Sequence, residues 1–339
     1  MLSFHGAEAN PMGLQHYELN LLEALRTSPQ DRWTFAPRTV TAMRAQPAGS
    51  TRIPMGLVEN ASARVARVAG AWVSRGADYV HRFDLRLPPA AAPEVVTVHD
   101  LPPLRFDDEG RLPGWSVSTA RRSRLVICPS AFAAQEAVDL LGVRDVAVVP
   151  NGVSDVFHAP AARPVEVPQR YLLHVGGATR RKNLTALGEA WRIAARELPD
   201  VSMLLVGPPD RRRDEAFDGA PRTVQLGYRA ATDVAALMQH ALAVVVPSTY
   251  EGFGLPAVEA MAAGAPVVAA ECGALPEVCG GAAMLVTPTA DGLARAIVTI
   301  ARDDDARAEL SARGRAHAAG FTWAASAHGH LTAYARAFG

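Results

Sequence analysis

Short apolar runs alternate with longer amphipathic stretches along most of the chain. The runs are rich in β-branched residues and lack polar alternation, which is typical of parallel strands buried on both faces. The stretches between them are rich in Ala, Leu and Arg and have helical periodicity. The expected strands are Val95–Val98, Leu125–Cys128, Val146–Val149, Tyr171–Val175, Met203–Val206, Val224–Leu226, Ala243–Val246 and Val267–Ala270. Strand–helix–strand repetition of this kind predicts an α/β fold with parallel sheets.

A break in this pattern predicts where the chain divides into domains. The segment 158–168 holds three prolines and has neither helical nor strand periodicity, as expected of a linker. A length of 339 residues also favours two domains. We therefore expect an N-terminal domain over 1–152, a linker over 153–169 and a C-terminal domain over 170–320. A last helix over 321–339 is a candidate to pack back on the N-terminal domain.

Composition excludes several functional classes. Lys+Arg and Asp+Glu balance at 34 each, so no overall field attracts the chain to nucleic acid, and an anionic ligand needs a local site. Cys128, Cys272 and Cys279 have no CxxC pairing and predict free thiols rather than disulfides or zinc. No signal peptide or membrane-spanning run is evident, so the expected location is the cytoplasm.

The stretch Ala61–Arg75 is strongly amphipathic. The apolar residues Val65, Val68, Ala69, Trp72 and Val73 share a helix face, and Arg64, Arg67 and Arg75 lie outside that face. Such a helix could lie on an anionic bilayer as a peripheral contact. We favour the other interpretation, in which the apolar face packs on the N-terminal sheet. A second arginine run, Arg211–Arg213, is expected to be a solvated loop.

The richest candidate site directly follows the strand Ala243–Val246. Gly252 and Gly254 permit a tight turn and a close approach of backbone to a ligand. Pro256 suits the first turn of a helix, where its missing N–H costs nothing. The backbone N–H groups at this helix start form a predicted anion site. The residues that would present them are Phe253, Gly254 and Leu255.

Two carboxylates, Glu251 and Glu259, frame this helix start, with seven residues between them. A carboxylate would be repelled by a phosphate, so neither is expected to contact one. Each is better suited to accept hydrogen bonds from neutral hydroxyls. The sequence therefore assigns Glu251 to a sugar and Glu259 to a ribose.

A cationic turn follows the strand Tyr171–Val175. Gly176 and Gly177 lead into Arg181 and Lys182, a combination that can cradle a diphosphate. The spacing matches neither the dinucleotide fingerprint nor a P-loop, so an NAD or ATP site finds no support.

These segments resemble the retaining GT-B glycosyltransferases of family 4. Residues 251–259 match the family's E-x7-E motif, and 175–183 resemble its "VG…RKN" turn. Residues 273–277 resemble its "GG.PE" turn, 97–101 its "VHDL" and 148–153 its "VVPNGV". The resemblance thus covers most of the chain and is densest from 145 to 290.

The resemblance implies two Rossmann-like domains that face each other across a cleft. Glu251 would hold the hydroxyls of the donor sugar and Glu259 the ribose. Lys182 and Arg181 would neutralise the diphosphate, and His99 would lie beside the sugar. The other donor-binding residues it implies are Gly13, Gly176, Gly177, Gly207, Phe253, Gly254 and Leu255.

The reaction implied is hexose transfer with retention, in which the leaving phosphate takes the proton of the acceptor hydroxyl. No metal and no bound cofactor are expected. GDP-mannose is the first donor expected, because the "VHDL" and "RKN" forms are frequent among mannosyltransferases; UDP-glucose and UDP-N-acetylglucosamine come next. The acceptor hydroxyl could belong to a glycan, a lipid-linked molecule or a small molecule.

One departure from the family keeps other functions open. The family opens with a full strand and a Gly-Gly pair, whereas this chain has only Met1–His5 and the single Gly13. Either the chain starts late or this edge of the acceptor site is altered. The alternatives are a non-catalytic sugar-nucleotide-binding protein and a sugar-nucleotide epimerase or phosphorylase on a related fold.

Overall fold

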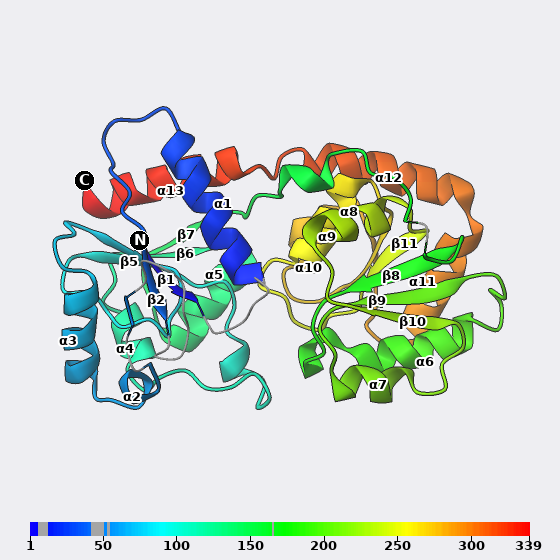
Figure 1. Cartoon of the computed structure of the whole chain (residues 1–339), viewed down its shortest axis with the longest axis horizontal. Coiled ribbons are helices and arrows are strands. Elements are labelled where there is room, and N and C mark those ends of the chain that lie inside the picture. Colours follow the sequence, from blue (N-terminus) through cyan, green and yellow to red (C-terminus); the bar gives the residue numbers. More distant parts are fainter. Residues whose placement is uncertain (6–12, 42–50, 53–54, 165) are drawn as a thin grey trace. The chain divides into compact units, whose positions relative to one another are not determined.

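The computed structural model describes residues 1–5, 13–41, 51–52, 55–164 and 166–339 and divides into two compact units. Unit 1 comprises Met1–Gly152 together with Trp323–Gly339, and unit 2 comprises Val153–Thr322. The proline-rich stretch therefore belongs to unit 2 and the last helix belongs to unit 1. Each unit contains one parallel sheet (Figure 1).

The sheet of unit 1 has the strand order β3-β2-β1-β4-β5-β6-β7, with every neighbouring pair parallel. Its strands are β1 (Leu2–His5), β2 (Arg38–Thr41), β3 (Thr51–Arg52), β4 (Val80–Arg82), β5 (Glu94–Thr97), β6 (Leu125–Cys128) and β7 (Val146–Val148). Its helices are α1 (Gly13–Thr27), α2 (Met55–Glu59), α3 (Ala63–Val73), α4 (Ser116–Ala120), α5 (Ala131–Glu136) and α13 (Trp323–Phe338).

The sheet of unit 2 has the order β10-β9-β8-β11-β12-β13 and is also entirely parallel. Its strands are β8 (Tyr171–Val175), β9 (Ser202–Val206), β10 (Thr223–Gly227), β11 (Ala243–Val246), β12 (Val267–Ala270) and β13 (Met284–Val286). Its helices are α6 (Leu184–Ala194), α7 (Arg211–Phe217), α8 (Ala231–Gln239), α9 (Leu255–Ala263), α10 (Leu275–Cys279), α11 (Ala290–Arg302) and α12 (Asp304–Ala318).

The prediction of two α/β domains with parallel sheets is confirmed. Each residue of β5, β6, β9, β11 and β12 is buried, as expected of strands with helices on both faces. In both sheets the first and fourth strands in chain order lie side by side at the centre. This is the Rossmann order, and ligands bind such sheets where the carboxyl ends of the central strands diverge.

A buried polar cluster joins α13 to the sheet of unit 1. The Tyr17 hydroxyl lies 2.8 Å from His330 Nε2, and His330 Nδ1 lies 2.8 Å from the Ser326 carbonyl. His81 lies 2.7 Å from both the Tyr334 hydroxyl and Thr97 Oγ1. Because a carbonyl only accepts, His330 Nδ1 carries the proton, and Nε2 accepts from Tyr17. Figure 1 shows α13, in red, beside α1.

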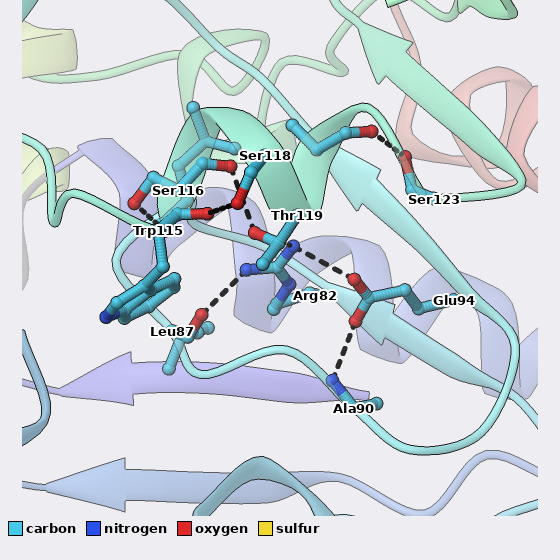
Figure 2. A network of polar contacts seen from close by, with 11 residues as sticks. Arg82, Leu87, Ala90, Glu94, Trp115, Ser116, Ser118, Thr119 and Ser123 are labelled. Atoms are coloured by element: carbon cyan, nitrogen blue, oxygen red, sulfur yellow. Dashed lines mark hydrogen bonds and ion pairs between the residues drawn. The ribbon is translucent and has the colours of Figure 1, made fainter. Parts of the chain in front are cut away.

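A buried ion pair fixes the loop between β4 and β5. The fully buried Arg82 donates to Glu94 at 3.1 Å and to the Leu87 carbonyl at 2.7 Å. Glu94 accepts a second hydrogen bond from the Ala90 N–H at 2.9 Å. Figure 2 shows the Arg82 guanidinium between Leu87 and Glu94, next to Thr119 of α4. The loop is thus tied to the end of β4 through Leu87 and to the start of β5 through Ala90.

Breaking this pair is expected to destabilise unit 1. Glu94→Gln leaves the buried Arg82 charge without its carboxylate, which costs about 3–5 kcal/mol in the free energy of unfolding. Urea denaturation followed by tryptophan fluorescence measures the loss. Asp145→Asn is the control, because its pair with Arg336 is half exposed on both sides and is worth about 1 kcal/mol or less. Equal losses in the two variants would show that burial does not strengthen the Arg82–Glu94 pair.

The favoured prediction for the amphipathic helix is wrong for Val65, Val68 and Trp72, whereas Val73 of the same predicted face does pack inward. The residues of α3 that pack inward are the small ones and Val73, namely Ala66, Gly70 and Val73. The larger apolar side chains Val65, Val68 and Trp72 are 55%, 71% and 53% exposed. At Gly70 the inward side of α3 lies too close to the Pro88–Pro89 backbone for any side chain.

Candidate functional site

In unit 2 the candidate site lies at the carboxyl ends of the central strands β8 and β11. These strands are neighbours, with Leu172 and Leu173 paired to Ala243 and Val244. Chain direction diverges after them, since β8 continues into α6 and β11 into α9. The cationic turn and the glycine-rich turn predicted from the sequence therefore meet at one point of the sheet, where parallel α/β folds bind ligands.

The turn after β8 contains one turn of 3-10 helix, Arg180–Lys182, and ends at Asn183. Asn183 has φ 55° and donates from its side-chain amide to the carbonyls of Pro247 and Pro288, at 3.1 and 2.9 Å. The left-handed backbone is one that asparagine tolerates better than most residues. Asn183 thus links the loops that follow β8, β11 and β13.

Glu251 is held between two cations of that turn. Lys182 Nζ lies 2.6 Å from its Oε1, and Arg181 Nη1 lies 3.1 Å from its Oε2. Glu251 is 6% exposed. Burial alone would raise the pKa of this carboxyl, but Lys182 and Arg181 outweigh burial and hold the pKa below its usual value. Glu251 is therefore ionised at neutral pH. Both cations lie in the turn that follows the carboxyl end of β8.

The glycine-rich turn delivers backbone N–H groups to the same place. Gly254 caps α9 with φ 93°, and a Cβ there would lie 2.7 Å from Leu275 Cδ2, so glycine is required. Among the described residues, no acceptor pairs with the N–H groups of Phe253, Gly254 and Leu255. The Phe253 ring is fixed edge-on against Phe321, with centroids 5.7 Å apart. Three unpaired N–H groups at a helix N-terminus form a site for an anion.

Glu259 lies in the second turn of α9 and is half-buried. Its carboxyl has no hydrogen-bond or ion-pair partner in the parts of the chain that the structure describes. Burial raises the pKa of Glu259 to about 7. An unpartnered carboxyl with a raised pKa is characteristic of a group whose partner is a ligand.

Three glycines lie beside the cationic turn: Gly176 and Gly177 follow β8, and Gly207 follows the neighbouring strand β9. Gly207 follows β9 with φ 148°, and a Cβ on it would lie 2.0 Å from the Gly176 carbonyl oxygen. A Cβ on Gly177 would meet no atom within 4 Å, so that position is open. The backbones after β8 and β9 thus touch directly, and only glycine permits this contact.

The expectation that Arg211–Arg213 is a solvated loop is wrong for Arg213. These residues begin α7, and Arg213 is 1% exposed. It donates to the Gly176 carbonyl at 2.6 Å and to the Pro208 carbonyl. The sequence holds the missed signal: Asp210 caps the helix, so Arg213 shares the buried face of Ala216 and Phe217. Arg213 thereby fixes the backbone at the start of the glycine turn after β8.

In unit 1, His99 lies just beyond the carboxyl end of β5. Its ring meets Tyr17 edge-on at 4.3 Å, and its Nε2 is buried without a partner among the described residues. Burial lowers the pKa of His99 to about 4, so the imidazole is neutral at neutral pH. Gly13 is the first residue of α1. The stretch before it, 6–12, lies outside the described residues.

No bilayer-spanning candidate exists among the helices described, because none is both long and apolar enough. The described residues also contain no group of three or more His, Cys, Asp or Glu side chains arranged to hold a metal ion. Cys128 and Cys279 are buried thiols, and Cys272 is half-buried.

Family models match both units. Residues 13–157 match the model described as Glycosyltransferase Family 4, and 169–303 match that of Glycosyl transferases group 1. The chain is 30% identical over 279 residues to O-antigen chain mannosyltransferase B of Escherichia coli, covering 75% of this chain and 73% of that protein.

Solved structures of the same fold cover the whole chain. Sucrose-phosphate synthase from Thermosynechococcus elongatus superposes with a TM-score of 0.78 at 21% identity, covering 99% of this chain and 98% of that one. HepE from Anabaena, in complex with UDP and glucose, superposes with a TM-score of 0.73 at 20% identity, covering 98% of each chain.

Proposed function

Because this chain belongs to the family 4, group 1 glycosyltransferases and has their GT-B fold, we propose that it moves a hexose from a nucleoside diphosphate sugar to an acceptor hydroxyl with retention. The observation that carries the proposal is the meeting of Lys182, Arg181 and Glu251 at the carboxyl ends of β8 and β11. That cluster lies where a parallel sheet binds ligands, and it combines phosphate-binding cations with a carboxylate for hydroxyls.

In this proposal unit 2 holds the donor. Lys182 and Arg181 neutralise the diphosphate as negative charge develops on the leaving group, which is the main catalytic contribution. The N–H groups of Phe253, Gly254 and Leu255 add neutral donors to the same site. Glu251 accepts hydrogen bonds from the sugar hydroxyls. The leaving phosphate oxygen takes the acceptor proton, so no dedicated base is needed.

The three glycines after β8 and β9, together with residues of unit 1, complete the proposed donor contacts. Gly176, Gly177 and Gly207 let the diphosphate approach the backbone. Arg213 fixes that backbone through its hydrogen bond to the Gly176 carbonyl. In unit 1, His99 supplies a neutral imidazole beside the sugar, and Gly13 opens α1 on the phosphate side. We propose that no metal ion and no bound cofactor take part.

The donor we propose first is GDP-mannose. The 30% identity to O-antigen chain mannosyltransferase B supports mannose as the sugar. UDP sugars are the second choice, and HepE, whose structure holds UDP and glucose, supports them. The acceptor is proposed only as a hydroxyl of a glycan, a lipid-linked molecule or a small molecule.

Glu259 provides the test of the donor site. To accept hydrogen bonds from both ribose hydroxyls the carboxyl must be ionised, and its pKa of about 7 makes ionisation depend on pH. Donor affinity is therefore expected to be about tenfold weaker at about pH 6 than at about pH 8. Calorimetry with GDP-mannose and with UDP-glucose, across this pH range, measures how donor affinity depends on pH and identifies the nucleotide.

Three variants make the test specific. Glu259→Ala is expected to abolish the thermal stabilisation by donor, and Glu259→Gln to flatten the pH dependence. Glu189→Ala, an exposed carboxylate on α6, serves as the control and should change neither. Donor binding that is unchanged in Glu259→Ala would remove Glu259 from the site. No stabilisation of the wild type by either nucleotide would contradict the proposed function.

A further inference from the structure

An apolar stripe faces solvent on α3 and on the neighbouring α2. Val65, Val68 and Trp72 of α3 are each more than half exposed, and Leu57 of α2 is 74% exposed. The three α3 residues fall at positions i, i+3 and i+7, so they form one row along the helix. Isolated exposed apolar residues are common, but a row of this kind marks an interaction surface.

The orientation of α3 is fixed by its opposite face. A Cβ on Gly70 would lie 2.0 Å from the Pro89 carbonyl oxygen, so the helix backbone rests directly on the Pro88–Pro89 segment. Ala66 and Val73 are buried beside Gly70. Turning the stripe inward would force Val65 or Trp72 into a space that admits only glycine. The stripe is therefore a permanent outer face of unit 1.

A hollow of about 740 Å³ lies at the edge of α3 and is lined by three arginines, Arg67, Arg122 and Arg124. No ion pair or side-chain hydrogen bond engages these guanidinium groups within the described chain. The one carboxylate in the lining, Glu94, is already bound to Arg82 and to the Ala90 N–H (Figure 2). Glu94 also interacts electrostatically with Arg67, but one carboxylate cannot balance the arginines around it, so the hollow keeps a net positive charge and suits an anion.

This hollow is separate from the proposed transfer site. Glu94 begins β5 and Arg124 immediately precedes β6, so the hollow opens at the amino-terminal edge of the sheet. His99 follows the other end of β5. The stripe and the hollow share α3, because Arg67 lines the hollow and Arg64, one turn earlier, lies between Arg67 and Val68 on the helix circumference.

We propose that the α2–α3 surface, defined as Leu57, Val65, Val68 and Trp72 with the arginine hollow, binds an anionic lipid bilayer. The apolar row enters the boundary between head groups and acyl chains, and lipid phosphates occupy the hollow. Charge complementarity selects this occupant: a helix with an apolar face flanked by arginines binds anionic membranes. A second copy of the chain fits less well, because a two-fold contact would bring the same arginines together.

Vesicle co-sedimentation tests the proposal with the full-length protein. We expect binding to vesicles with roughly 30% phosphatidylglycerol, no binding to pure phosphatidylcholine, and loss of binding at about 0.5 M NaCl. Arg67→Glu/Arg122→Glu/Arg124→Glu is expected to lower the partition coefficient at least about a hundredfold, since each basic residue contributes about fivefold. Trp72→Ala with Val68→Ser is expected to lower it about tenfold or more.

Controls separate a specific surface from charge in general. Arg196→Glu/Arg295→Glu changes exposed arginines of unit 2 and should keep wild-type binding, as should Leu19→Ser on α1. Thermal melting shows that the variants fold, and donor stabilisation, measured separately, reports on the proposed function alone. Free glycerol phosphate at millimolar concentration should not release the protein, because it lacks the apolar contact.

Three results would overturn the proposal. Equal binding of wild type and triple variant would exclude the hollow, and wild-type release by glycerol phosphate would indicate a soluble phosphate ligand instead. A concentration-dependent dimer that Val68→Asp converts to monomer, without vesicle binding, would assign the surface to a second copy of the chain.

Discussion

Lys182→Met is expected to lower kcat about a thousandfold, because it removes the cation that faces the charge developing on the leaving diphosphate. The Lys182 side chain is 13% exposed and its ammonium is paired with Glu251 at 2.6 Å, so it is held in place before any donor binds. Release of GDP from GDP-mannose, with simple mannosides as trial acceptors, measures the loss. The Michaelis constant is expected to change far less, since the interaction is stronger in the transition state than in the bound donor.

Two further variants show whether the charge at this position is responsible. Lys182→Arg keeps the charge and should recover part of the rate, although a planar guanidinium cannot reproduce a compact ammonium. Arg180→Met removes an exposed cation from the same 3-10 turn and should retain activity within about threefold. A Lys182→Met enzyme that keeps more than about a tenth of the wild-type kcat would be inconsistent with transition-state stabilisation by Lys182.

Acidification from about pH 7 to about pH 5 is expected to destabilise unit 1 by several kcal/mol. His81, His99 and His330 are held neutral, mainly by burial, and the pKa of His99 and of His330 is lowered to about 4. An unfolded histidine titrates near 6.5, so between these values the unfolded chain binds more protons than the folded one. Stability is therefore present above about pH 6.5 and is lost as the pH falls towards about 4.

The size of this effect follows from the two pKa values that are defined. At about pH 5, a histidine with a folded pKa of about 4 and an unfolded pKa of about 6.5 costs about 2 kcal/mol. His99 and His330 together account for about 4 kcal/mol, and His81 adds to the loss. That is a large part of the stability of a typical domain, about 5–15 kcal/mol. Urea denaturation at several pH values measures it.

His330→Gln is the matched variant for the acid effect. An amide oxygen can still accept from the Tyr17 hydroxyl, but it does not titrate. The variant is expected to lose some stability at neutral pH. Its free energy of unfolding should then fall less steeply on acidification, because unfolding takes up about one proton fewer than in the wild type. A pH profile parallel to that of the wild type would mean that His330 is not part of the acid response.

The sheets could be predicted from the sequence because strands buried on both faces have continuous apolar runs, which are easy to recognise. Apolar runs such as Val244–Val246 tolerate no polar residue, and the glycines after them mark the turns. The candidate site was equally accessible, since Glu251 and Lys182 come from turns that follow central strands. What the sequence could not show is that these two residues form an ion pair, because they are 69 positions apart and the sequence does not reveal which strands are neighbours.

Three features could not be predicted, each for a physical reason. An amphipathic helix has the same periodicity whether its apolar face is packed or exposed, so the sequence does not reveal that Val65, Val68 and Trp72 of α3 face solvent. The burial of Arg213 depends on the helix cap at Asp210, which places Arg213 on the buried face of α7. A run of three arginines does not by itself show which of them is buried. The hydrogen-bond partner of Tyr17 in α13, His330, lies 313 residues away, and histidine and tyrosine are not distinctive enough to indicate such a pairing.

The discontinuity of unit 1 has a consequence for the order in which a ribosome-bound chain folds. Unit 2 is one continuous segment, Val153–Thr322, whereas unit 1 needs Trp323–Gly339 to supply α13. During synthesis the first 152 residues emerge early but wait for the last seventeen. Until then Tyr17 lacks its partner His330, and His81 lacks its partner Tyr334. Unit 2 can therefore complete its core first, although domains usually fold in order from the N-terminus. A nascent chain stalled before residue 323 would present a folded second half and an unfinished first half.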